Sequence, residues 1–136
     1  NKTLCVRLNG STDIPFERIK IKSRGLSIMD AFPEVQFVDY TKRFERLGKT
    51  PANLHLTFSR SETNESFCKL ALKRGHNVAV VLAGKFPKTF LDVPTISGDE
   101  HDLRHLDPMR AGGYVIVLAP KGHKAKRDTS GFVVRS

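Results

Sequence analysis

The feature that most constrains the fold is an almost uninterrupted apolar run at residues 77–83, Asn-Val-Ala-Val-Val-Leu-Ala, which ends before Gly84 and Lys85. A strand with one solvated face alternates apolar and polar residues. A strand that is covered on both faces of a parallel sheet instead reads as a continuous apolar run. We therefore expect residues 77–83 to form a central strand of a parallel sheet.

Shorter segments of the same kind lie on both sides of this run, and helix-like segments separate several of them. We expect further strands at residues 4–8, 35–41, 54–58 and 114–119, with a short edge strand at 132–134. Short helices are expected at residues 26–32 and 43–47. Strands that alternate with helices predict an α/β fold, with a mostly parallel sheet and right-handed βαβ crossovers.

The clearest helix in the sequence follows residues 59–61. Glu62 and Glu65 are expected in its first turn and Lys73 in its last turn, and Gly75 ends it. Acidic residues at the start and basic residues at the end of a helix interact favourably with its dipole. Apolar residues three and four positions apart give this helix one face to bury.

Residues 84–113 contain three prolines and are expected to be largely irregular. Within them, His101 and His105 are four positions apart and have carboxylates nearby, a pattern that can indicate a metal site. The sequence is not HExxH, however, and Pro108 limits any helix that could place both rings on one face. A solvated acidic turn is the competing interpretation, and we expect no metal.

The chain has 136 residues, the size of one domain, and Lys and Arg outnumber Asp and Glu by 23 to 14, so its formal net charge is +9. This excess favours anionic partners such as nucleic acid, nucleotides or phosphorylated metabolites, although it can also serve solubility alone. Cys5 and Cys68 show no CxxC spacing, so we expect reduced, buried thiols. No apolar run is long enough to cross a membrane, and we expect a cytoplasmic protein.

Polar residues follow most of the expected strands, where binding sites of parallel α/β folds lie. These strand-end residues are Arg7, Asn9, Asp39, Lys42, Ser59, Arg60, Glu62, Lys85 and Lys121. We expect them to converge on a common rim, although strand ends are also polar for solubility and capping.

A basic loop follows the strand expected at residues 114–119. Its fixed cations are Lys121, Lys124, Lys126 and Arg127. Such a loop can offer ammonium groups and backbone N–H donors to phosphates, so it is the best candidate for an anion site. A merely solvated loop is the alternative. No aromatic residue lies between these cations, so the loop itself does not predict stacking on bases.

Five segments of the chain carry a family resemblance: VRLNG at 6–10, VDYTK at 38–42, LHLTFS at 54–59, GDEHDLR at 98–104 and KRDTSGF at 126–132. In this order they resemble an uncharacterised family of phage and plasmid proteins. Full-length members of that family look like distant relatives of radical SAM barrels, and this chain resembles their C-terminal half. The resemblance implies a partial, TIM-like half barrel with a strand-end pocket at Asn9, Asp39, Lys42, Ser59, Asp99, Asp102 and Arg104.

The same resemblance bears on cofactors and partners. An N-terminal half would hold a cysteine-rich cluster motif that this chain lacks, and the chain starts without Met just before a strand, so an absent upstream half is expected. No cofactor is expected in this chain, although SAM or a nucleotide could bind. A half barrel has open sheet edges, so a second copy, the missing half or a host protein is expected to cover them.

The sequence has no complete catalytic motif, and three functions follow from it as hypotheses. The first is a phage-derived protein of a bacterial host's cytoplasm that binds nucleic acid or another polyanion through its strand-end face. The second is a fragment of a nucleotide- or SAM-binding enzyme, with a pocket that includes Asp39, Lys42, Glu62 and Asp99. The third is a phage inhibitor of a host protein. Whether the chain is an enzyme stays open at this point.

Overall fold

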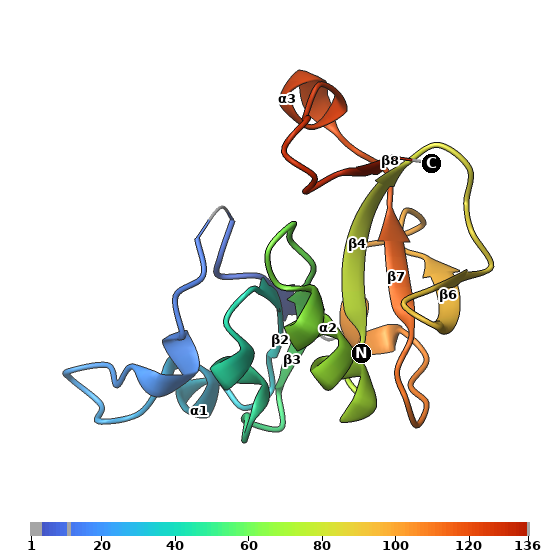
Figure 1. Ribbon diagram of the computed structural model, residues 1–136. Helices are drawn as coiled ribbons and strands as arrows, with labels where there is room; N and C mark the ends of the chain where they lie inside the picture. Colours follow the sequence, from blue (N-terminus) through green and yellow to red (C-terminus); the bar gives the residue numbers. More distant parts are fainter. Residues whose placement is uncertain (1–3, 11, 136) are drawn as a thin grey trace.

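A mostly parallel sheet organises the molecule. The computed structural model describes residues 4–10 and 12–135, and at positions 123 and 124 it describes only the backbone. The strand order is β1 (Cys5–Val6), β2 (Gln36–Thr41), β3 (Leu54–Ser59), β4 (Val78–Ala83), β7 (Val115–Leu118), β6 (Val93–Ser97) and β5 (Thr89–Phe90). All neighbours are parallel except β5 and β6, and β8 (Val134–Arg135) runs parallel to β4. The α/β class and the central place of β4 are thus confirmed (Figure 1).

The main hydrophobic core lies on one face of this sheet. Phe58, Val78 and Val115 are partners in adjacent strands, so their side chains share this face, and each is fully buried. The short helix α1 (Ile28–Ala31) and the 3-10 helices η1 (Phe16–Arg18) and η2 (Phe44–Leu47) pack against the same core. The two short helices expected from the sequence therefore exist, but in shortened form.

The main helix, α2 (Glu65–Lys73), covers the same face beside β4 (Figure 1). Cys68, Ala71 and Leu72 pack into the core, as the apolar spacing predicts. Phe67 stays about half exposed and lies against the Phe44 ring, with the ring centroids 5.2 Å apart.

The start of α2 differs from the prediction. The helix begins at Glu65, so Glu62 lies in the turn before it. The side chain of Asn64 holds this turn: its Oδ1 accepts a hydrogen bond from the Ser61 N–H at 2.7 Å, and its amide donates to the Ser59 carbonyl at 3.0 Å. Asn side chains compete with the helical backbone in this way, which favours turns and helix starts.

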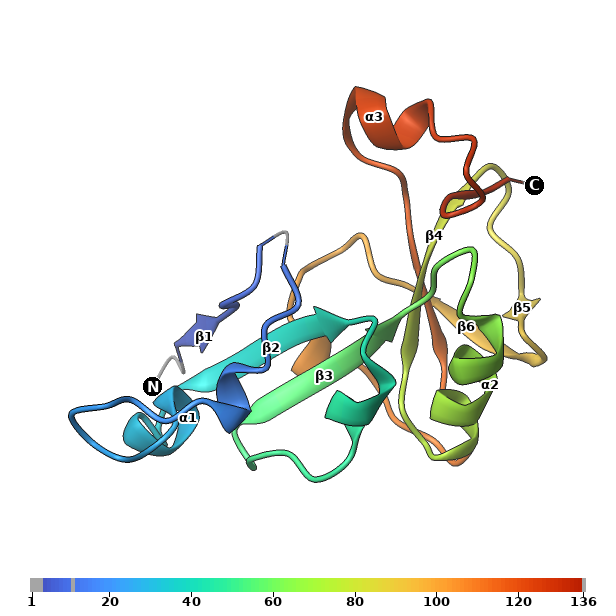
Figure 2. The ribbon, with the colours of Figure 1, turned by 60° about the vertical axis from the view of Figure 1, so that its left-hand side comes forward.

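The sheet is strongly staggered between β3 and β4, which pair only at Phe58↔Val78 and Ser59↔Ala79. Beyond that point, Arg60 donates to the backbone carbonyls of Gly131 and Phe132 at 2.7 and 3.1 Å, and these residues lead into β8. In Figure 2, β4 accordingly turns away steeply from β2 and β3. The sheet is not closed, so the parallel α/β class is established but the TIM-like half barrel is not.

Strand β6 was missed in the stretch that the sequence predicts to be irregular. Pro94 argues against a strand because it has no N–H to donate. The pairing of β6 with β7 begins only at Thr95, so the missing donor lies outside that ladder. Other strands differ at their ends: β1 covers only Cys5–Val6, and β8 begins at Val134 rather than Phe132.

Fewer elements cover the opposite face of the sheet, although Ala79 and Ile116 on that face are buried. Ser59, Ala79 and Ile116 lie on it, and the 3-10 helix η3 (Arg104–Leu106) packs against β3. Helix α3 (Gly122–Lys126) projects beyond the carboxyl ends of β4 and β7 in both ribbon views (Figures 1 and 2). Among the described helices, none has the length and apolar character needed to cross a membrane.

Candidate binding site

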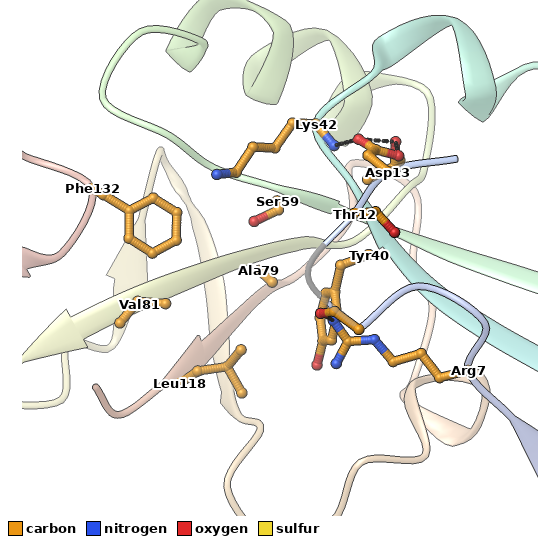
Figure 3. Close-up of a pocket in the computed structure, with 12 residues that line it drawn as sticks. Arg7, Thr12, Asp13, Tyr40, Lys42, Ser59, Ala79, Val81, Leu118 and Phe132 are labelled. Atoms are coloured by element: carbon orange, nitrogen blue, oxygen red, sulfur yellow. Dashed lines mark hydrogen bonds between the residues drawn. The ribbon is translucent and has the colours of Figure 1, made fainter. Parts of the chain in front are cut away.

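A cavity of about 390 Å³ opens on this less covered face, near the carboxyl ends of the strands. Its apolar floor is formed by Ala79, Val81 and Leu118 of β4 and β7. Polar residues from β2 and β3 line one side, and Phe132, just before β8, lines the other (Figure 3). We call this space the first cavity.

Two cations in the first cavity lie against aromatic rings. The Lys42 Nζ atom is 4.5 Å from the centroid of the Phe132 ring, and the Arg7 guanidinium carbon is 4.9 Å from that of Tyr40. In Figure 3, Lys42 and Phe132 lie on one side of Ser59, and Arg7 and Tyr40 lie on the other. Rings hold cations by their quadrupole and leave most N–H donors available to a ligand.

A buried ion cluster centred on Arg46 supports this rim from behind. Arg46 is only 1% exposed; its Nη1 atom is 2.6 Å from Asp13 Oδ1 and 3.5 Å from Asp39 Oδ2. Its Nη2 and Nε atoms contact the two oxygens of Glu17 at 2.9 and 3.0 Å. Asn9 adds an amide hydrogen bond to Asp39. The cluster therefore joins the loop after β1 to β2 and η2.

The two carboxyls of this cluster that touch cavities respond differently to burial. Burial alone would raise the pKa of Asp13, but hydrogen bonds from the Lys42 N–H, the Thr41 hydroxyl and Arg46 lower that pKa below its ordinary value. Burial dominates at Asp39 and raises its pKa, although Asn9 and Arg46 oppose the shift. Asp13 is thus held as an anion, whereas the charge of Asp39 is disfavoured.

A second cavity of about 400 Å³ adjoins the first and shares Arg7 and Tyr40 with it. Its other charged lining residues are Asp39, Asp102, Arg104 and Lys121. Arg104 is 2% exposed, and its Nη2 atom donates to the His101 carbonyl. The described residues contain no group of three or more His, Cys, Asp or Glu side chains placed to hold a metal ion.

The sequence model of the family described as Gene product 88 matches residues 1–136, the whole length of the chain. The chain belongs to the Gene product 88 family. This result supports the expected phage-type family of unknown function, whereas the radical SAM relationship stays a prediction. No curated protein and no solved structure matches the chain.

The structure of this Gene product 88 protein separates the strand-end residues into groups. Lys42 and Ser59 line the first cavity, and Asp39, Asp102, Arg104 and Lys121 line the second. Arg60, Glu62, Asn9 and Asp99 line neither cavity and serve other contacts.

Each of these four residues has structural partners. Arg60 donates to the backbone before β8, and the Glu62 carboxylate accepts a hydrogen bond from the Ser130 hydroxyl at 3.1 Å. Asn9 is 1% exposed and donates to the Ile14 carbonyl as well as to Asp39. Asp99 accepts from the Ala119 N–H at 3.1 Å, which links the loops after β6 and β7. They shape the rim and its loops.

The basic loop of the Gene product 88 protein lies only partly at the cavities. Lys121 lines the second cavity, while Lys126 and Arg127 are exposed at and after the end of α3. The side chain of Lys124 lies outside the described part of the chain. Arg135 fastens the loop, because its Nη2 atom donates to the Lys126 carbonyl at 2.8 Å.

Sequence reasoning missed several residues of the site. Tyr40 and Phe132 lie within recognised segments, but their rings meet cations only in the folded chain. Asp13 and Arg46 lie in a loop and a 3-10 helix that carry no motif. One signal in the sequence could have indicated a buried ion cluster: a short helical segment with an apolar face also carries charged residues, Arg46 among them.

Proposed function

We propose that this Gene product 88 protein binds nucleic acid through the strand-end face of its sheet, by contacts to phosphate groups. The observation that carries the proposal is the pairing of cations and rings in the first cavity, Arg7 with Tyr40 and Lys42 with Phe132. Guanidinium and ammonium groups bind phosphates, and partly exposed rings such as those of Tyr40 and Phe132 can stack on unpaired bases. A single strand fits this combination better than a duplex, whose bases are already stacked.

The distribution of charge supports the same proposal. The chain carries a formal net charge of +9. The carboxylates of Asp13 and Glu17 both accept hydrogen bonds from the buried Arg46. Asp13 lines the first cavity, but its carboxylate also accepts from the Thr41 hydroxyl and the Lys42 N–H, so protein donors already compensate its charge. Lys126 and Arg127 extend the basic surface beyond the cavities, where a longer strand would run.

A free nucleotide-like ligand, SAM included, is the second candidate. The volume of the first cavity, about 390 Å³, is within the usual range for small-molecule sites, and the cavity lies where parallel sheets bind ligands. Under this second proposal, the chain is a fragment of a larger enzyme of the half-barrel type, and another chain covers the open edges of its sheet. A thermal-shift screen with AMP, ATP and SAM tests it, because a ligand that binds the folded state raises the unfolding temperature.

The nucleic-acid proposal is tested by fluorescence anisotropy with labelled single-stranded DNA and RNA over a range of salt concentrations. The variant Arg7→Ala/Lys42→Ala should lower the affinity about tenfold or more, and should make the salt dependence shallower by about 1.4, since each phosphate contact contributes about 0.7 for a single strand. The matched control is Lys69→Ala/Lys73→Ala, which removes the same charge from exposed positions of α2 on the other face.

Equal losses of affinity in the two double variants would show that only net charge matters, and would refute a strand-end site. Binding that does not change with salt would refute phosphate contacts altogether.

A further inference from the structure

The two cavities are continuous in their lining, because Arg7 and Tyr40 belong to both. The Arg7 side chain is 45% exposed and, among the described residues, is held only by weak contacts: a long ion pair with Asp39 at 3.7 Å and a hydrogen bond to the Gly10 carbonyl at 3.2 Å, beside the Tyr40 ring. A ligand that displaces this side chain slightly can extend from one cavity into the other.

Arg104 lies in the second cavity with donors that the described residues leave unused. Its Nη2 atom donates to the His101 carbonyl, and its Nε atom is 3.3 Å from Asp107 Oδ2 without hydrogen-bond geometry. No described residue accepts a hydrogen bond from Nη1, although the guanidinium is buried. An unpaired donor on a buried cation is costly, so an acceptor from a ligand would be strongly favoured there.

Position 98 gives the Arg104 guanidinium its room. A Cβ atom at Gly98 would overlap Arg104 Nη1 and would also collide with the side chains of Ile116 and Leu118. The lack of a side chain at position 98 therefore keeps the buried cation on this face of the sheet, at the wall of the second cavity.

Two other cations line the same space. Arg7 and the exposed Lys121 join Arg104 there, against Asp39 and Asp102. Asp39 already receives a hydrogen bond from Asn9 and lies 3.5 Å from Arg46 Nη1, so the balance at the cavity wall favours an anion. Guanidinium groups bind phosphate through paired N–H donors, which suits Arg104.

We propose that the second cavity is a second phosphate subsite of the same groove, so the ligand carries at least two phosphate groups and spans both cavities. This inference rests on the proposed function and narrows its ligand to a dinucleotide or a nucleic-acid strand rather than a single nucleoside monophosphate. Arg104 and Lys121 bind the second phosphate, and Lys42 and Arg7 bind the first.

The first test is a titration of the ¹⁵N-labelled protein with the 5′-phosphorylated dinucleotide pApA, followed by NMR. Two sets of signals report on the cavities: the Arg104 Nε–H with the Asp102 and Lys121 amides for the second, and the Lys42 and Ser59 amides for the first. Both sets should shift together. Shifts at Lys42 and Ser59 alone would overturn the second subsite but leave the proposed function intact.

Other outcomes of the titration separate the two proposals further. Shifts at Arg104 and Lys121 alone would support a phosphate site in the second cavity and refute the role of the first cavity. An absence of shifts in both sets would overturn both proposals.

The second test compares the affinities of pApA and AMP. The second phosphate should strengthen binding about tenfold, the effect of one charge-assisted hydrogen bond. Lys121→Ala, at an exposed position, and Arg104→Lys, which keeps the charge, should each remove most of this gain. Equal affinities of pApA and AMP, or a gain that survives in Lys121→Ala, would overturn the inference.

A longer probe distinguishes the two possible sources of the phosphates, a nucleic-acid strand and a free dinucleotide. A single-stranded oligonucleotide that binds much more tightly than pApA would identify a nucleic-acid strand as the ligand. Equal affinities of the two would identify a free dinucleotide.

Discussion

The buried cluster around Arg46 makes a sharp prediction about stability. Replacing Arg46 with Met keeps much of the apolar stem but removes the partner of three carboxylates, at 2.6 Å from Asp13, 2.9 Å from Glu17 and 3.5 Å from Asp39. Removing one partner of a buried ion pair costs about 3–5 kcal/mol, because the remaining charge stays buried without compensation. Since a domain is stable by only about 5–15 kcal/mol, Arg46→Met should lose a large part of its stability.

The measurement is urea unfolding followed by circular dichroism, because the chain contains no tryptophan. The matched control is Arg43→Met in the same segment. Arg43 pairs with Glu45 at the surface, where both side chains are about half exposed, so this variant should unfold at nearly the wild-type urea concentration. An Arg46→Met protein as stable as the control would refute the view that Arg46 holds the cluster together.

The loss in Arg46→Met should also depend on pH. The pKa of Asp13 is lowered in the folded protein, so its contacts stabilise the fold above the ordinary value of 3.8, and this contribution is lost as the pH falls through the lowered pKa. Without Arg46 the buried carboxyls gain protons more readily. The difference from wild type should therefore shrink as the pH falls below 3.8, toward the lowered pKa of Asp13. A constant difference over that range would show that lost packing, not charge, causes the effect.

Three further predictions concern the core and the thiols. Gly113→Ala should lower the free energy of unfolding in urea by about 3 kcal/mol, because a Cβ atom there would collide with the His76 carbonyl. Gly25→Ala, at a similar positive φ but in open space, should lower it by only about 1 kcal/mol. Equal losses would show that backbone strain alone is responsible. Burial raises the pKa of Cys68 to about 11. At about pH 8, iodoacetamide should therefore label the partly exposed Cys5 well before the buried Cys68, as measured by mass spectrometry. Rapid labelling of Cys68 in the folded protein would contradict this prediction. Because that pKa is raised, the contribution of Cys68 to stability is complete below its ordinary value of 9.0 and should be lost as the pH rises toward about 11, a slope that Cys68→Ala should lack.

The parallel sheet could be predicted because its strands are continuous apolar segments of the right length. Residues 77–83 predict the central strand β4, and the spacing of the segments predicts parallel crossovers, which the pairings of β2, β3, β4 and β7 confirm. Strand β6 could not be predicted, because Pro94 is unfavourable in most strands, and only the folded structure shows that the ladder with β7 begins after it, at Thr95.

The candidate site was predictable only in outline. Placement at the carboxyl ends of the strands follows from parallel topology, and it brings Lys42 and Ser59 together as expected. The sequence could not predict which strand-end residues line a cavity and which form hydrogen bonds to other parts of the chain instead. Arg60 and Glu62 follow the same strand, yet both are drawn toward the segment before β8, seventy or so residues away in the sequence.

Sequence alone determined the order of the main parallel strands and of the long helix, the basic character of the chain and the edge of the sheet at which polar groups collect, because these properties depend on local apolar patterns and on composition. Tertiary structure decided which charges are buried and which stay open. Arg46 and Arg104 look like ordinary surface residues in the sequence, and they become the most buried cations only when distant segments fold over them. The free energy of a charge depends on its distance from water and from its partners, and those distances exist only in the folded chain.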